Sequence, residues 1–179
     1  MIMRRSSTSY PCRIADGEQA LRSDFVTALE FSDSVHLDLD PASTYALVSD
    51  ITRMGEWSPV CKACWWDDPA AGAVAGAWFT GRNELPERTW ETRSQVVVAE
   101  PDREFAWEVN NGWVRWGFTI EPADGGSTLT QYWRFLPKGI EGFGEKFGAD
   151  ADNQIAQRSE LAHRGIPETL AAIQATAAG

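Results

Sequence analysis

The chain has 179 residues and a formal net charge of −10, with 26 acidic residues against 16 lysines and arginines. Its length suits one domain with a substantial core of its own. The acidic balance disfavours binding to nucleic-acid phosphates and to anionic membrane surfaces. No apolar run is long enough to span a bilayer. We therefore expect a single globular domain that binds no nucleic acid and has no membrane span.

The first 32 residues are polar and weakly patterned. No apolar segment follows Arg4 and Arg5, as a signal peptide would require. We interpret residues 1–32 as a flexible N-terminal extension and residues 33–179 as the domain. A short amphipathic helix over Glu18–Phe31 is the alternative. An odd cysteine count without secretory context favours a reduced, cytoplasmic protein; the cysteines are Cys12, Cys61 and Cys64.

Regular structure is predicted to begin with a half-buried strand. Val35, Leu37 and Leu39 alternate there with polar residues. Asp40 followed by Pro41 is typical of a helix start, which predicts a helix to about Ser49. A second short helical turn is expected over residues 50–54.

The middle of the chain reads as a series of strands separated by tight-turn residues, which indicates an antiparallel meander. After Gly139 the composition becomes helical, and a long C-terminal helix is predicted between Glu141 and Ala178. Gly165 and Pro167 are expected to kink or divide it. These elements predict an α+β fold in which a curved antiparallel sheet of about seven strands surrounds the long helix. The six strands of the middle region are predicted at 62–67, 77–83, 89–100, 103–109, 113–121 and 127–136.

All nine tryptophans lie between residues 57 and 133 of the chain. Indole is the largest apolar side chain and has a single polar group, an N–H donor. Nine such rings either crowd the core or form the wall of a ligand site. Adjacent strand residues face opposite sides of a sheet, so only part of the set can point inward. We predict inward rings at Trp57, Trp90, Trp107, Trp116 and Trp133, joined by Phe79 and Phe118.

The element order and several local motifs resemble the START-like, or helix-grip, superfamily (SRPBCC). More narrowly, they resemble its bacterial polyketide cyclase/dehydratase-type branch, which shares its fold with the plant Bet v 1-type proteins. The resemblance covers about residues 33–177. The segments that carry it are Val48–Pro59, Gly76–Asn83, Ala99–Phe105 and Gly165–Ile173.

This resemblance implies a ligand cavity between the sheet and the C-terminal helix, and no universal catalytic motif. Pro167 departs from the pattern, because members usually keep this helix unbroken. Polar groups expected to orient a ligand are Asn83, Arg115, Gln131 and Tyr132. Phe143 and Phe147 are expected near the cavity mouth.

Other chemical motifs have plain structural interpretations. Cys61 and Cys64 lack the further ligands of a structural zinc site and the βαβ context of a thioredoxin-like motif, so we interpret them as two small packed thiols. The glycine-rich segment 139–148 has neither the spacing nor the parallel βαβ unit of a dinucleotide fingerprint, and we interpret it as a flexible loop. His36 and His163 have no evident catalytic partner. No cofactor or metal is predicted.

Three hypotheses for the function follow. The first is binding or carriage of a small hydrophobic or aromatic molecule in an internal cavity. The second is an enzyme of the cyclase or dehydratase type, which would add an acid–base group to that cavity. The third is an interaction module, such as a co-chaperone-like domain, with a filled interior. The sequence does not identify the ligand, and it leaves open whether the chain forms a homodimer.

Overall fold

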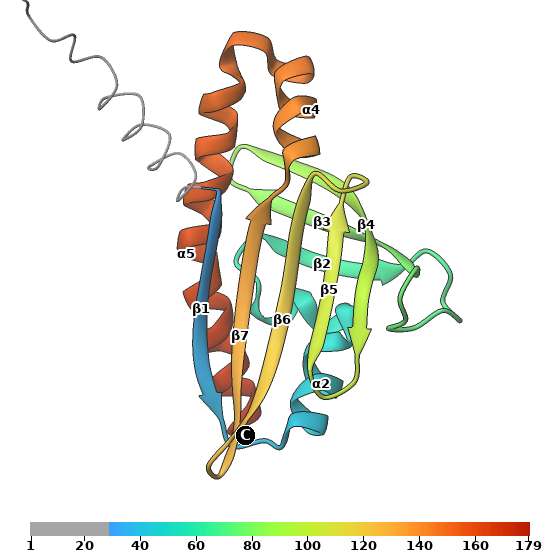
Figure 1. The fold of residues 1–179 in the computed structure, drawn as a ribbon, viewed down its shortest axis with the longest axis vertical. Coiled ribbons are helices and arrows are strands. Elements are labelled where there is room, and N and C mark those ends of the chain that lie inside the picture. The colour runs from blue at the N-terminus through green and yellow to red at the C-terminus, as the bar shows by residue number, and fades with distance from the viewer. Residues whose placement is uncertain (1–28) are drawn as a thin grey trace, which may run out of the picture.

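A computed structural model describes residues 29–179. One seven-stranded antiparallel sheet dominates the fold, in the spatial order β1-β7-β6-β5-β4-β3-β2. It curves strongly, so that β2 and β3 run across behind the nearly vertical β6 and β5 (Figure 1). The strands are β1 (Glu30–Leu37), β2 (Cys61–Trp66), β3 (Trp78–Leu85), β4 (Arg88–Glu100), β5 (Glu104–Val109), β6 (Val114–Ala123) and β7 (Gly126–Phe135).

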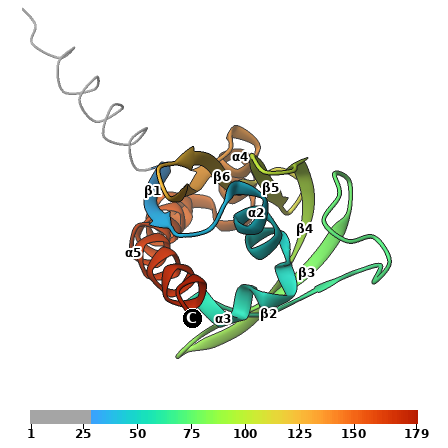
Figure 2. The same cartoon turned by 90° about the horizontal axis from the view of Figure 1, so that it is seen from below.

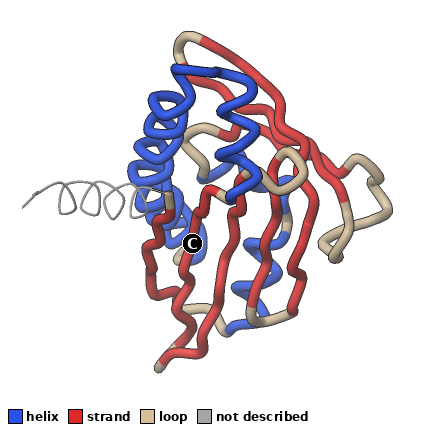
Figure 3. Tube along the Cα trace, turned by 45° about the horizontal axis from the view of Figure 1, so that its top comes forward, coloured by secondary structure: helices blue, strands red, loops and turns tan. Residues whose placement is uncertain are grey.

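The helices lie along the open side of the curved sheet. Viewed from below, α5 stands beside β1, α3 lies next to β2, and α2 lies under β6 and β5 (Figure 2). α4 and the first turns of α5 form a helical pair at the top of the molecule (Figures 1 and 3). The helical elements are α2 (Pro41–Ser49), η1 (Ile51–Arg53), α3 (Met54–Trp57), α4 (Pro137–Phe147), η2 (Gly148–Asp150) and α5 (Ala151–Ala177).

The predicted architecture is confirmed: a helix-grip fold with seven antiparallel strands and a long C-terminal helix. Three local predictions need correction. β1 begins at Glu30, inside the segment assigned to the extension, because residues 30–32 pair with β7. Pro167 does not divide α5: it lies inside this helix, which is continuous over all 27 of its residues. The predicted loop 139–148 is mostly helix α4. The rest of the proposed extension, including the alternative helix up to residue 28, lies outside the described residues.

The core lies where α5 and α2 pack on the concave face of the sheet. Its most deeply buried large aliphatic side chains come from α5, β7, β1, β4 and the α2–η1 region; they are Ile166, Ile173, Leu129, Leu37, Val96, Val48 and Ile51. Burying these side chains removes apolar surface from water and fixes the helix against the sheet. None of the helices found between residues 29 and 179 combines the length and apolar character that a membrane crossing requires.

Helix α2 begins as the sequence predicts, with Asp40 as its N-cap. One carboxylate oxygen of Asp40 accepts from the Ser43 backbone N–H at 2.9 Å, and the other accepts from the Ser43 hydroxyl at 2.9 Å. These hydrogen bonds stabilise the ionised carboxylate and lower the pKa of Asp40. The aspartate cap is therefore strongest when this side chain is ionised.

Asp40→Ala is expected to destabilise the protein at neutral pH, because it leaves helix N–H groups without a partner. The lowered pKa means that the stabilisation is fully present above the pKa of Asp40 in the unfolded chain. It is lost as the pH falls through the lower folded-state value. Urea unfolding at pH 7 and at acidic pH measures this, and the gap between wild type and Asp40→Ala should narrow in acid. Asp40→Asn is the control, since asparagine caps without titrating; if it shows the same narrowing, the pH effect arises elsewhere.

Candidate functional site

An open cavity of about 630 Å³ lies between the concave face of the sheet and the helices α3, α4 and α5. All strands from β2 to β7 contribute to its lining. Ligand sites for small organic molecules have volumes of about 300–1,000 Å³ and mostly apolar walls. The interior of this domain is therefore not filled by its own side chains, which argues against the filled-core hypothesis.

Six of the nine tryptophans line this cavity. They include every ring predicted to point inward, together with one that the prediction omitted; the six are Trp57, Trp90, Trp107, Trp113, Trp116 and Trp133. Phe79 and Phe118 lie in the same wall. The lining is thus an aromatic surface contributed by α3 and several strands.

The pleat of the sheet explains the inward set. Trp107 pairs with Trp116 across β5 and β6, and Trp116 pairs with Trp133 across β6 and β7. Directly opposed residues of antiparallel strands share a face, so these three rings form a row on the concave side. The Trp116 and Trp133 ring centroids are 6.4 Å apart. Such tilted neighbours stabilise each other and leave their remaining faces for a ligand.

The other three tryptophans lie outside the lining. Trp65 faces solvent and is 40% exposed, whereas its neighbour Trp66 packs edge-on against Phe79. Trp78 lies under the guanidinium of Arg93, 4.3 Å from its ring centroid. The predicted split of the tryptophans between the two faces of the sheet is therefore present.

Trp113 was missed because it does not belong to a strand. It lies in the turn before β6, which begins at Val114, so strand alternation does not apply to it. The preceding residues Asn110, Asn111 and Gly112 all have positive φ, a conformation that asparagine and glycine adopt most readily. This turn directs Trp113 toward α4, where its ring meets Phe143 at 5.5 Å between centroids.

Two glycines of the segment 139–148, Gly139 and Gly142, allow α4 to pack closely against Trp113. A Cβ atom at Gly139 would lie 2.2 Å from the backbone oxygen of Trp113, and one at Gly142 would lie 2.5 Å from its indole ring. Only glycine permits this approach. It brings Phe143 and Phe147 of α4 into the cavity lining.

Two of the four predicted polar groups line the cavity and two do not. Asn83 and Gln131 are in the lining. Arg115 and Tyr132 lie on the opposite face, where they bind Glu108 at 2.5 Å and Glu104 at 2.7 Å respectively. Both alternate with inward residues of β6 and β7, which is the physical reason for the correction. Burial and Glu104 raise the pKa of Tyr132.

Two residues of the cavity lining each carry a buried polar atom that has no hydrogen-bond partner among residues 29–179. The atoms are Trp57 Nε1, a donor, and Gln131 Oε1, an acceptor. Leaving such an atom unpaired costs about 1–3 kcal/mol. Buried groups of this kind are normally satisfied by protein or by water, so unpaired ones in a cavity wall suit a ligand with its own polar groups.

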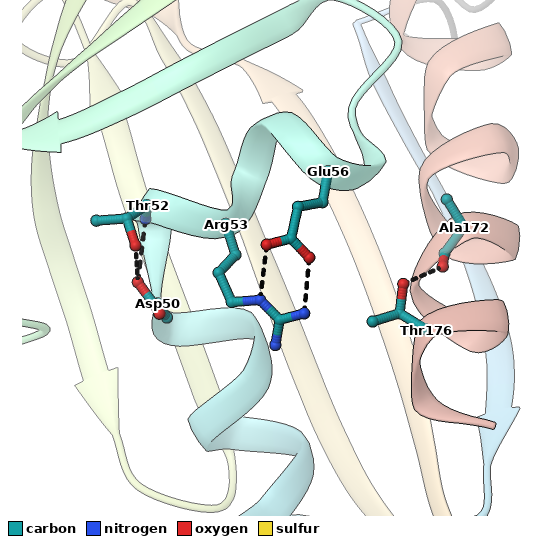
Figure 4. Close-up of polar contacts among 6 residues, drawn as sticks. All are labelled: Asp50, Thr52, Arg53, Glu56, Ala172 and Thr176. Atoms are coloured by element: carbon teal, nitrogen blue, oxygen red, sulfur yellow. Dashed lines mark hydrogen bonds and ion pairs between the residues drawn. The ribbon is translucent and has the colours of Figure 1, made fainter. Parts of the chain in front are cut away.

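A charged pair lies beside Trp57, outside the cavity lining. Arg53 donates to both carboxylate oxygens of Glu56, with Nε–Oε1 at 3.0 Å and Nη2–Oε2 at 2.7 Å, and its guanidinium lies over the Trp57 ring at 5.4 Å. Figure 4 shows this pair on the turn opposite the last turns of α5, with Asp50 capping the turn through Thr52. A bidentate pair restricts the arginine and keeps its guanidinium over Trp57, although neither Arg53 nor Glu56 is itself part of the cavity lining.

Cys61 and Cys64 also line the cavity, with their sulfur atoms 3.3 Å apart. Residues three apart normally face opposite sides of a strand. A bulge between Cys61 and Ala63 shifts the register, so both thiols lie on the concave face. Either thiol can donate the hydrogen bond between them. Because Cys64 can donate to the thiolate of Cys61, this bond lowers the pKa of Cys61, while the same bond and burial raise the pKa of Cys64.

We expect the Cys61 thiol to be alkylated with a pH midpoint below that of an ordinary cysteine, about 8.5. Replacing its partner, Cys64→Ala, should raise that midpoint, because the donated hydrogen bond is lost while burial remains. The measurement is the rate of iodoacetamide labelling against pH by peptide mass spectrometry, in a Cys12→Ala background. Cys61→Ala is the control: Cys64 then loses the hydrogen bond that most raises its pKa, so it should label at lower pH than in wild type, while burial keeps its midpoint above that of an ordinary cysteine. Identical profiles for Cys61 with and without Cys64 would contradict the assignment.

The comparison with protein-family models matches residues 28–163 to the family described as polyketide cyclase/dehydrase and lipid transport. The chain belongs to this family. The resemblance inferred from the sequence is thereby confirmed. A comparison with curated proteins gave no significant match.

Solved structures of related proteins agree with the family assignment. The chain is 54% identical to a polyketide-cyclase-like protein of Corynebacterium glutamicum, with a TM-score of 0.60, covering 81% of this chain and 88% of that one. The KanY protein is 21% identical, with a TM-score of 0.61, and the match covers 84% of this chain and 98% of KanY.

A more distant match extends the likeness in fold. The di-domain ARO/CYC protein StfQ of the steffimycin biosynthetic pathway is 15% identical, with a TM-score of 0.62. The match covers 90% of this chain and 55% of StfQ. At this low identity, the match shows that this chain and StfQ share a fold.

Proposed function

We propose that this protein binds a small hydrophobic or aromatic molecule in the cavity between its sheet and its C-terminal helix. The observation that supports this most directly is an aromatic cavity of about 630 Å³ with a buried unpaired donor and acceptor in its wall. The apolar rings would bury the body of the ligand, and Trp57 and Gln131 would orient its polar group.

We propose carriage or sensing ahead of catalysis because the cavity lining contains few side chains that suit an acid or a base. Within residues 29–179 the titratable side chains of the lining are Cys61, Cys64, Arg88, Glu91, Lys146 and Arg158. None is a histidine, and the one carboxylate, on Glu91, is exposed. A cyclase or dehydratase reaction remains the alternative, and it would need one of these groups as its acid or base. A reduced, cytoplasmic location belongs to the same proposal, in keeping with the odd number of cysteines.

The binding proposal is tested with N-phenyl-1-naphthylamine, a neutral aromatic probe whose emission rises in apolar surroundings. We expect saturable binding of one probe per chain, with energy transfer from the lining tryptophans. Native mass spectrometry of freshly purified protein provides an independent readout and should detect a co-purified apolar compound. A linear, non-saturating response together with no retained compound would contradict the proposal.

A further inference from the structure

Three positively charged side chains from different elements border the cavity in this acidic protein. Arg88 is the first residue of β4, Lys146 lies on α4 and Arg158 lies on α5. The β3–β4 hairpin reaches across to α5 just below α4 (Figure 1), which places Arg88 near Arg158. The three cations thus gather where the hairpin meets the helical pair at the top of the molecule.

None of these three cations has an ion-pair partner within residues 29–179. Arginines of the strands elsewhere in that range do: Arg93 binds Asp67 at 2.6 Å, and Arg134 binds Glu30 at 3.0 Å. The cations of the cavity instead rest on aromatic rings that line it. The charge-to-centroid distances are 4.3 Å for Arg88 on Trp90, 5.2 Å for Lys146 on Phe147 and 5.6 Å for Arg158 on Phe143.

The absence of an ion-pair partner is least favourable for Arg158, which is partly buried and close to the charge of Arg88. Its Nη1 atom donates to the backbone and side-chain oxygens of Gln154 at 3.3 Å and 2.8 Å, which are uncharged acceptors. Burial and the positive charge of Arg88 together lower the pKa of Arg158. Like charges that are close and partly desolvated repel each other, and a nearby anion would relieve this repulsion.

The single carboxylate of the lining does not neutralise the group. Glu91 belongs to β4, but it alternates onto the other face from Arg88, Trp90 and Thr92. Its cross-strand neighbour on β3 is Arg82. The cavity therefore has an aromatic interior and a positively charged border.

We propose that the ligand of this cavity is an amphipathic acid whose anionic group is held by Arg88, Lys146 and Arg158. The inference rests on the proposed binding function and names the chemical class of its ligand. The apolar or aromatic body lies among the tryptophans, and the carboxylate or similar oxyanion lies at the border. Charge-assisted hydrogen bonds from guanidinium groups suit such an oxyanion.

A matched pair of probes tests this inference. 8-Anilinonaphthalene-1-sulfonate has the same ring framework as N-phenyl-1-naphthylamine and adds one anionic group. We expect Arg158→Gln to weaken binding of the sulfonate about tenfold, the effect of losing one charged hydrogen bond. Binding of the neutral probe should change less than about twofold, because it makes no such bond. Raised salt should weaken binding of the sulfonate alone.

Two further variants make the result specific. Lys146→Gln removes an exposed cation of the group and should act in the same direction with little effect on folding. Arg164→Gln is the matched control, because it removes an equal charge from an exposed position on the same helix outside the lining. Thermal unfolding monitored by circular dichroism verifies that each variant is folded.

The outcomes separate the two proposals. If the neutral probe binds but Arg158→Gln and Lys146→Gln affect both probes alike, or neither, the acid ligand is wrong and the binding function stands. If Arg164→Gln weakens the sulfonate as much as Arg158→Gln does, the effect is long-range charge, and the assigned group is wrong. If neither probe binds, both proposals fail.

Discussion

Replacing Phe105 with alanine is expected to lower the free energy of unfolding by about 3–5 kcal/mol. Phe105 is fully buried on β5, with Tyr45 edge-on at 6.4 Å and Trp107 at 5.9 Å between ring centroids. It is not part of the cavity lining, so its removal leaves a void in the closed core. Denaturant unfolding followed by circular dichroism measures the loss.

Trp65→Ala is the control for Phe105→Ala. Trp65 is also a large aromatic residue of the sheet, but it is 40% exposed. Its replacement should change stability by less than about 1 kcal/mol. The affinity for N-phenyl-1-naphthylamine should be the same in Phe105→Ala and in wild type. A loss below about 1 kcal/mol for Phe105→Ala would show that the region is less tightly packed than the structure indicates.

Ser94→Trp is expected to weaken binding of the neutral probe by at least about tenfold, a loss of about 1.4 kcal/mol. Ser94 lies on β4 within the lining, opposite Phe79 on β3 and Val109 on β5. An indole at this position would occupy space that the ligand needs. Because the cavity can accept the ring, the protein should still fold.

The matched control for Ser94→Trp is Thr89→Trp on the same strand. Thr89 is exposed and lies outside the lining, so an indole there adds the same side chain without entering the cavity. Fluorescence titration measures the affinity of both variants for the neutral probe, and circular dichroism verifies that both are folded. Unchanged binding by a folded Ser94→Trp protein would place the probe elsewhere on the molecule.

Local sequence patterns were sufficient for most of the fold. The Asp40–Pro41 helix start, the turn residues between the strands and the alternation at Phe105, Trp107 and Val109 each depend on neighbours in the chain. Conformational preferences of this kind act over a few residues, so they can be read without the tertiary structure. The same alternation identified the inward tryptophans of β5, β6 and β7.

Several of the predictions that the structure corrected depend on contacts between distant parts of the chain. Arg115 was assigned to the cavity although it alternates with Val114 and Trp116 and therefore faces outward. The joint placement of Cys61 and Cys64 depends on a bulge that only pairing with β3 reveals. The glycine-rich segment 139–148 was interpreted as a loop, since glycines oppose helix formation locally, whereas the close contact of α4 with Trp113 requires two of them, Gly139 and Gly142.

The sequence by itself indicated the helix-grip architecture and the aromatic character of the interior, because periodicity, turn residues and residue types are read directly from the chain; the family followed from the resemblance of its local motifs. Only the tertiary structure decided which rings enclose the cavity and which polar atoms are left unpaired in its wall. It also decided that Arg88, Lys146 and Arg158 border the same space, although they are far apart in the sequence. Such groupings arise from the curvature of the sheet and the packing of the helices against it, and no segment of the chain contains them alone.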